Sequence, residues 1–201
     1  MKLHWSPKSP YVRKVMICVN ELQLGERVEL IRSVAAMLKP NAEIMKANPL
    51  SKIPTLMLDD GSTLFDSSVI CQYLNELGKG ALFPAEGASK WQSLRWQALG
   101  DGMTDALILW RNEREREYPN QVLMDAFHLK VATALAMLEG EVPALQNSPF
   151  SIGHISLCCS LGYLDYRFEA IGWRTLAPAL SAWYAQMLKR PAIHSTLPVD
   201  G

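Results

Sequence analysis

The chain has 201 residues, of which 49% are hydrophobic and 20% charged, so it can bury the core of one large domain or two small ones. Lys plus Arg number 20 and Asp plus Glu number 20, so the overall field attracts neither nucleic acid nor an anionic membrane. No signal-peptide pattern and no stretch of about 18 apolar residues occurs, so we expect neither a signal peptide nor a membrane span.

The first 78 residues alternate between short strands and helices. Ser9 followed by Pro10 predicts a helix start, because serine suits the N-cap and proline the first helical position. Apolar residues then recur at helical spacing up to Gly25. Strands are predicted at 3–5, 28–31, 53–58 and 63–65, a short helix or turn at 40–48, a hairpin turn at 59–61 and a further helix after Asp66. This order, β-α-β-α-β-β-α, predicts a mixed sheet with helices packed on it.

The rest of the chain reads as helical. Residues 79–88 have the composition of a linker, and everything after them shows helical spacing. Helices are predicted at 89–117, around 127–138, at 155–168 and at 176–188. The predicted organisation is therefore an α/β domain at 1–78, a linker at 79–88 and an all-α domain at 89–201.

Four cysteines, Cys18, Cys71, Cys158 and Cys159, show no C-x-x-C pair, no zinc spacing and no disulfide framework. All fall in apolar helical segments, so buried, unreactive thiols are expected. We predict no metal site and a reducing, cytoplasmic location.

Three segments carry a family resemblance. They are S-P-K-S-P-Y-V-R-K-V at 6–15, N-P-L-S-K-I-P-T-L at 48–56 and L-F-D-S-S-V-I-C-Q-Y-L at 64–74. In order and spacing the chain resembles the cytosolic glutathione transferase superfamily along its whole length, and looks closest to small bacterial serine-type members. The resemblance implies a thioredoxin-like N-terminal domain, a helical C-terminal domain and glutathione as co-substrate.

By this resemblance, Ser9 matches the serine that donates a hydrogen bond to the glutathione thiolate. A hydroxyl at the positive end of a helix favours the thiolate over the poorly nucleophilic thiol. Ser9 as a simple helix cap is the alternative, and Ser6 is a weaker competitor for the chemical role. His4 and Trp5 occupy the region where tyrosine-type members carry their tyrosine, and no cysteine lies near position 9.

The remaining glutathione contacts are also implied by the resemblance. Ile53-Pro54 matches a cis peptide whose backbone pairs with the cysteinyl part of glutathione. Asp66 and Ser67 match residues that hold the γ-glutamyl ammonium and carboxylate, although as an N-cap they need no ligand. Two lysines, Lys39 and Lys52, are candidates for binding the glycyl carboxylate of glutathione. The alternative for each is a solvated surface residue.

An acceptor pocket for the electrophile is expected between the two domains. Aromatic and basic residues are the candidates for its wall, and core packing is the alternative for each. They are Trp5, Tyr11, Trp110, Arg114, Tyr163 and Tyr166. If several of them line it, the electrophile is apolar or aromatic.

One position departs from the family pattern. Many members carry an S/T-x-x-D box that caps a helix of the second domain, and here Ser151 is followed by His154 at the aspartate position. A neutral imidazole accepts only one hydrogen bond. We expect either a weaker cap or a neutral His154 nitrogen that partly replaces the carboxylate; a solvent-facing histidine is the alternative.

The leading functional hypothesis is a glutathione transferase that adds the thiolate to small electrophiles. Peroxide or disulfide reduction or isomerisation at the same site is an alternative, as is a non-catalytic binding or regulatory protein on this scaffold. A homodimer is expected by resemblance, with no nucleic-acid or membrane partner.

Overall fold

The computed structural model describes residues 1–200 and divides them into two units. The first unit contains Met1–Phe83 together with residues 195–200, and the second contains Pro84–His194. The first unit holds β1 (Lys2–Trp5), α1 (Pro10–Glu21), η1 (Gly25–Arg27), β2 (Glu29–Arg32), α2 (Ala42–Met45), β3 (Thr55–Met57), β4 (Thr63–Leu64) and α3 (Ser67–Leu77). The second holds α4 (Gly87–Arg114), α5 (Gln121–Asn147), α6 (Ile152–Arg167), η2 (Glu169–Ile171), α7 (Trp173–Leu176), α8 (Pro178–Met187) and α9 (Pro191–His194).

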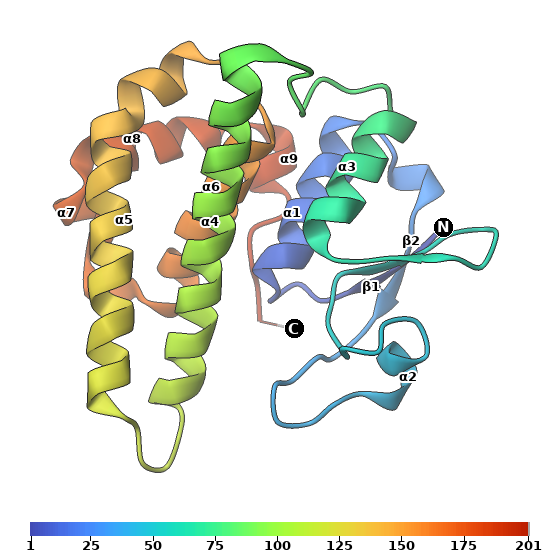
Figure 1. Ribbon diagram of the computed structural model, residues 1–201, viewed down its shortest axis with the longest axis horizontal. Coiled ribbons are helices and arrows are strands. Elements are labelled where there is room, and N and C mark those ends of the chain that lie inside the picture. Colours follow the sequence, from blue (N-terminus) through green and yellow to red (C-terminus); the bar gives the residue numbers. More distant parts are fainter. Residues whose placement is uncertain (201) are drawn as a thin grey trace. The chain divides into compact units, whose positions relative to one another are not determined.

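The first unit is built on a four-stranded mixed sheet in the order β2-β1-β3-β4. Strand β1 pairs with β2 in parallel and with β3 antiparallel, and β4 pairs antiparallel with β3. Helices α1 and α3 pack against each other, whereas α2 lies apart from them (Figure 1). The expected thioredoxin-like α/β domain followed by a helical domain is therefore confirmed.

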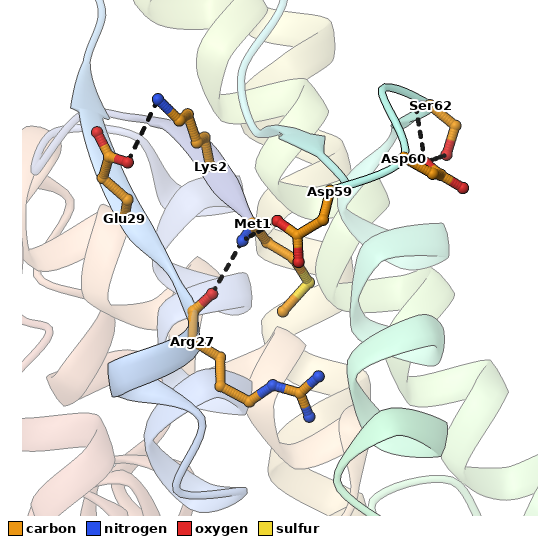
Figure 2. A network of polar contacts seen from close by, with 7 residues as sticks. All are labelled: Met1, Lys2, Arg27, Glu29, Asp59, Asp60 and Ser62. Atoms are coloured by element: carbon orange, nitrogen blue, oxygen red, sulfur yellow. Dashed lines mark hydrogen bonds and ion pairs between the residues drawn. The ribbon is translucent and has the colours of Figure 1, made fainter.

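Polar contacts tie one end of this sheet together (Figure 2). The N-terminal ammonium of Met1 donates to Asp59 Oδ1 at 2.9 Å and to the Arg27 carbonyl at 3.2 Å. Asp60 Oδ1 accepts from the Ser62 amide at 2.9 Å within the predicted turn between β3 and β4. The N-terminal end of β1 is thus bound to the β3–β4 turn, and the opposite end of the sheet carries the loops that lead into the helices.

The core of the second unit is α6. Residues Ile152–Leu164 are all buried, because this helix is apolar around most of its circumference. It packs on α4 so closely that a Cβ at Gly100 would come within 2.7 Å of the Ser156 backbone. The long helices α4 and α5 stand side by side and antiparallel (Figure 1). Glu141 of α5 joins them, accepting from Trp96 Nε1 at 2.6 Å and pairing with Arg95 at 2.7 Å.

Several predicted boundaries differ from the observed ones. The first helix ends at Glu21 rather than at Gly25, because Gln23 adopts a left-handed φ of 56° and the Leu24 amide closes onto the Val19 carbonyl at 2.9 Å. The helix predicted at 155–168 begins at Ile152, directly after its cap at Ser151. The short segments η1, η2, α7 and α9 were not predicted, since three or four residues carry no periodic signal.

Helix α5 is long and rich in apolar residues. By length and composition alone it could cross a membrane, but core helices of soluble proteins pass the same test, so this is weak evidence. Its buried residues follow a helical spacing of three to four, and the helix packs against α4 and α8. The absence of a membrane span stays a prediction.

Candidate functional site

Three loops meet at the end of the sheet opposite the Met1 contacts. Strand β1 runs toward this end and continues into the loop that carries Ser9. Because β3 is antiparallel to β1, with His4 opposite Thr55, Pro54 enters the sheet at the same end. Strand β4 is antiparallel to β3 and leads back to Asp66 and Ser67. The topology therefore brings together the predicted catalytic serine and most of the predicted glutathione-binding residues.

Ser9 is the N-cap of α1. Its hydroxyl oxygen accepts a hydrogen bond from the Val12 amide at 3.2 Å, and Pro10 occupies the first helical position. A serine hydroxyl has one proton to donate as well as lone pairs to accept. The capping bond therefore leaves the hydroxyl proton for another acceptor, and capping and a chemical role are compatible.

The backbone at Ile53 is open for pairing. The Ile53–Pro54 peptide bond is cis, as the resemblance implied. Within the described residues, neither the amide nor the carbonyl of Ile53 takes part in a hydrogen bond. Since β3 begins only at Thr55, the backbone amide and carbonyl of Ile53 are left over by the sheet and can pair with another segment.

Asn48 holds the loop that carries Ile53 and Pro54. Its side chain is 1% exposed, and its Nδ2 donates to the Lys52 carbonyl at 3.2 Å and to Thr55 Oγ1 at 3.0 Å. Its Oδ1 accepts from the Leu50 amide at 3.0 Å. One buried amide thus holds the backbone before Ile53 and the Thr55 side chain after it, a role that the sequence analysis missed.

Asp66 and Ser67 form the start of α3. The Asp66 carboxylate caps the helix by accepting from the Ser68 amide at 2.8 Å, while the Ser67 side chain is 3% exposed. Lys14 of α1, only 1% exposed, lies with its Nζ 3.4 Å from Ser68 Oγ. This contact links α1 to the start of α3, and the positive end of each helix favours bound anionic groups. A lysine inside the apolar run of α1 was the sequence signal for it.

The two candidate lysines for the glycyl carboxylate are both exposed. Lys39 lies in the segment between β2 and α2, where its amide donates to the Ala36 carbonyl at 3.3 Å. Lys52 immediately precedes Ile53, and its carbonyl is held by Asn48. Neither Nζ is in an ion pair within the described residues, so both are available to an anion.

Comparisons with known proteins show which family the chain resembles over its length. The family model of the glutathione S-transferase N-terminal domain matches residues 8–77, and that of the C-terminal domain matches residues 121–186. A glutathione transferase family member from Pseudomonas fluorescens Pf-5, solved with bound glutathione, is 40% identical over 99% of both chains, with a TM-score of 0.95.

The chain belongs to the glutathione S-transferase family.

Further structures and relatives extend this result. The Pseudomonas family member was also solved with bound S-(propanoic acid)-glutathione, at 39% identity over 100% of both chains and a TM-score of 0.90. A glutathione S-transferase from Methylobacillus flagellatus KT with glutathione bound is 33% identical over 98% of this chain and 99% of that one, with a TM-score of 0.87. The uncharacterized GST-like protein YibF of Escherichia coli K12 is 29% identical over 98% of both chains.

The six candidate acceptor residues of this transferase family member fall in both units. Trp5 and Tyr11, in the first unit, are half-buried. In the second unit, Trp110, Arg114 and Tyr166 line one cavity of about 930 Å³. Tyr163 is not among its lining residues. Its side chain is 2% exposed, its hydroxyl accepts from Arg111 Nη1 at 3.1 Å, and burial raises its pKa.

Aromatic rings and guanidinium groups form the walls of this cavity. Trp110 packs on Phe168 with ring centroids 4.9 Å apart. The Arg114 guanidinium lies 4.7 Å from the Phe168 ring centre and donates to the Arg167 carbonyl at 3.3 Å. The Arg167 guanidinium stacks 3.8 Å from the ring centre of Tyr166. The cavity thus offers flat apolar surfaces beside positive charge.

His154 replaces the usual aspartate of the helix cap without leaving the cap open. Its Nδ1 accepts from the Ser151 amide at 3.2 Å, so the ring proton sits on Nε2, which donates to the Leu145 carbonyl at 3.1 Å. The side chain is 2% exposed and lies against the rings of Trp96 and Phe150. Burial lowers the pKa of His154. These contacts are the ones expected of a neutral imidazole nitrogen that partly replaces the carboxylate, and the solvent-facing alternative is wrong.

All four cysteines are buried, as expected from their apolar surroundings, and none of them forms a disulfide within the described residues. Among residues 1–200, no three His, Cys, Asp or Glu side chains gather in a way that could hold a metal ion. Neither observation adds a further reactive group to the site around Ser9.

Proposed function

We propose that this family member catalyses attack of the glutathione thiolate on small electrophiles, by substitution or by conjugate addition. The observation that carries the proposal is the convergence of Ser9, the open Ile53 backbone and the start of α3 at one end of the sheet. Each of these features is complementary to one part of glutathione.

Each part of the tripeptide has a complementary group. The Ile53 amide and carbonyl pair with the cysteinyl backbone as an added strand. The Asp66 carboxylate receives the γ-glutamyl ammonium, and the Ser67 hydroxyl and amide at the start of α3 receive its carboxylate. Lys39 and Lys52, whose ammonium groups have no ion pair within the described chain, bind the glycyl carboxylate. Together these contacts hold the sulfur in one position, and such positioning of a reacting atom lowers the barrier of the reaction.

Ser9 stabilises the thiolate. Its proton is free to donate while its oxygen caps α1, and the positive end of that helix lies at the same position. Both effects favour the ionised sulfur, which is the nucleophile. The expectation of a serine-type member depends on this role.

Formation of a thioether is favoured over thiol redox chemistry by one relative. The Pseudomonas family member, 39% identical over the whole chain, binds S-(propanoic acid)-glutathione, a glutathione carrying a carbon substituent on sulfur. We therefore propose conjugation as the reaction of this protein as well. We further propose that Trp110, Arg114 and Tyr166, which line the cavity of the second unit, hold the electrophile. The roles of Trp5 and Tyr11 stay predictions.

The assembly and setting of the enzyme follow the same proposal. We propose a cytoplasmic homodimer that acts in detoxification of electrophiles, with α4 contributing to the interface between subunits. Sedimentation at micromolar concentration, where a dimer is expected, tests the assembly; a monomer would contradict it.

The decisive experiment has two stages. Retention on immobilised glutathione is followed by assays of the wild type and of Ser9→Ala with a panel of electrophiles, peroxides and disulfides. We expect retention of both proteins, conjugation by the wild type and a loss of turnover of roughly 100-fold in the variant, the scale of one missing hydrogen-bond donor to developing charge. Absence of both retention and turnover in the wild type would refute the proposal. Unchanged turnover in the variant would move the chemical role to Ser6 or to the backbone.

A further inference from the structure

Arg32 stands beside the loop that carries Ser9 and has no role in the site described so far. It is the last residue of β2, and in the parallel pairing of β1 and β2 its register partner is Trp5, the last residue of β1. The Ser33 amide extends this pairing by donating to the Trp5 carbonyl at 2.8 Å. The carboxyl ends of parallel strands meet at one edge, so Arg32 lies at the same end of the sheet as the Ser6–Ser9 loop.

Two contacts orient the Arg32 guanidinium toward that loop. Its carbon Cζ lies 5.4 Å from the centre of the Trp5 ring, which is within cation–π range. Its Nη1 lies 3.5 Å from Ser6 Oγ, and the Ser6 carbonyl in turn accepts from the Ser9 amide at 3.3 Å. The positive charge is therefore held next to the segment that positions the catalytic serine.

The charge of Arg32 is not neutralised by the described chain. Four other arginines form ion pairs with carboxylates of this protein: Arg95, Arg111, Arg116 and Arg174. In contrast, no carboxylate of residues 1–200 lies in an ion pair with Arg32, and the side chain is exposed. Lys8, the other cation of the loop, is 3.5 Å from Asp200. Since most N–H groups of the Arg32 guanidinium are unused, it can bind an incoming carboxylate through two parallel hydrogen bonds.

We propose that Arg32 is a specificity-determining residue that binds a carboxylate on the electrophile, so that the preferred substrates are small α,β-unsaturated carboxylic acids. This inference rests on the proposed conjugation reaction and names its substrate class. In the addition, the sulfur forms a bond to the β-carbon, the carbon–carbon π bond breaks, and its electron pair takes up a proton at the α-carbon. No oxidant or reductant is needed. The product is a carboxyalkyl thioether of glutathione.

A matched pair of product analogues tests the proposal by binding alone. S-carboxyethylglutathione and S-propylglutathione differ in a carboxylate against a methyl group, and their dissociation constants are measured by calorimetry. We expect the wild type to prefer the carboxylate. In Arg32→Gln, the dissociation constant of the carboxyethyl compound should rise roughly 3- to 10-fold, the scale of a charge-assisted hydrogen bond at an exposed site, and that of the propyl compound should not change.

Two controls separate the site from a general charge effect. Arg27→Gln removes an exposed arginine that lies just before the other end of β2. Figure 2 draws no partner for the guanidinium of Arg27. This variant should retain the preference for the carboxyethyl conjugate. Arg32→Lys should retain part of it, because an ammonium keeps the charge but not the planar pair of donors. The preference of the wild type should also shrink as salt is added.

The outcomes distinguish this inference from the proposed function. Equal binding of both conjugates by the wild type, or a preference that survives in Arg32→Gln, overturns the role of Arg32 and leaves glutathione conjugation intact. If the wild type binds neither glutathione nor either of the two conjugates, the proposed glutathione site is refuted, and the proposed role of Arg32 is refuted with it. A preference lost in Arg32→Gln and kept in Arg27→Gln supports both.

Discussion

Replacement of His154 by glutamine should change how the stability of the protein depends on pH. In the folded chain the imidazole is neutral, because Nδ1 accepts from the Ser151 amide while Nε2 donates to the Leu145 carbonyl. Burial, and secondarily the nearby positive charge of Arg190, lowers the pKa of His154. A proton on Nδ1 would face the Ser151 amide and break the cap.

The sign of the effect follows from this lowered pKa. In the unfolded chain a histidine takes up a proton near pH 6.5. Between that value and the lower folded pKa, the unfolded state binds more protons, so the free energy of unfolding falls as the pH is lowered. The loss is at most about 1.4 kcal/mol per pH unit for one proton, and it levels off below the folded pKa. Burial also lowers the pKa of His4. The resulting change in the free energy of unfolding is the same in the wild type and in the variant, so it cancels when the two are compared.

Glutamine at position 154 can still accept from the Ser151 amide, as in an ordinary capping box, but it does not titrate. It loses the bond to the Leu145 carbonyl and part of the packing against Trp96 and Phe150. At pH 7.5 we expect the variant to be less stable by about 1–3 kcal/mol. Below pH 6.5 this gap should narrow, by up to about 1.4 kcal/mol for each pH unit, because only the wild type loses stability at position 154.

Urea unfolding at pH 7.5, 6.5 and 5.5, at one fixed protein concentration, measures the gap. His194→Gln, which removes an exposed histidine from the same unit, controls for the loss of a histidine in general. A gap that stays constant across the three pH values would refute the neutral imidazole, and a gap that widens on acidification would mean that the charged form is favoured in the fold.

Two further predictions concern packing and the loop before Pro54. Gly100→Ala should destabilise the protein by about 1–3 kcal/mol, because the new methyl group meets the backbone of α6. Gly102→Ala on the same helix places its methyl group in open space and should stabilise the protein by up to about 1 kcal/mol. Thermal unfolding compares the two variants, and equal changes in stability would contradict the close approach of α4 and α6. Asn48→Ala should raise the dissociation constant of glutathione more than it lowers turnover at saturation, because the backbone at Ile53 loses its support. Calorimetry and steady-state kinetics measure both quantities, and loss of turnover alone would show that Asn48 does not position Ile53.

The sequence by itself determined the features that depend on neighbouring residues. The caps at Ser9, Asp66 and Ser151 and the turn near Gly61 were predictable, because each depends on backbone groups within about one helical turn or one hairpin. The order of strands and helices then followed from hydrophobic spacing, and with it the α/β and all-α architecture.

Only the tertiary structure decided which distant residues act together. Asn48 joins a loop to β3, Lys14 joins α1 to α3, and Arg32 reaches the Ser6 loop from the neighbouring strand. The protonation of His154 likewise depends on packing against residues far away in sequence, since burial favours the neutral ring. Such contacts depend on the register and packing of whole elements, which no local signal specifies.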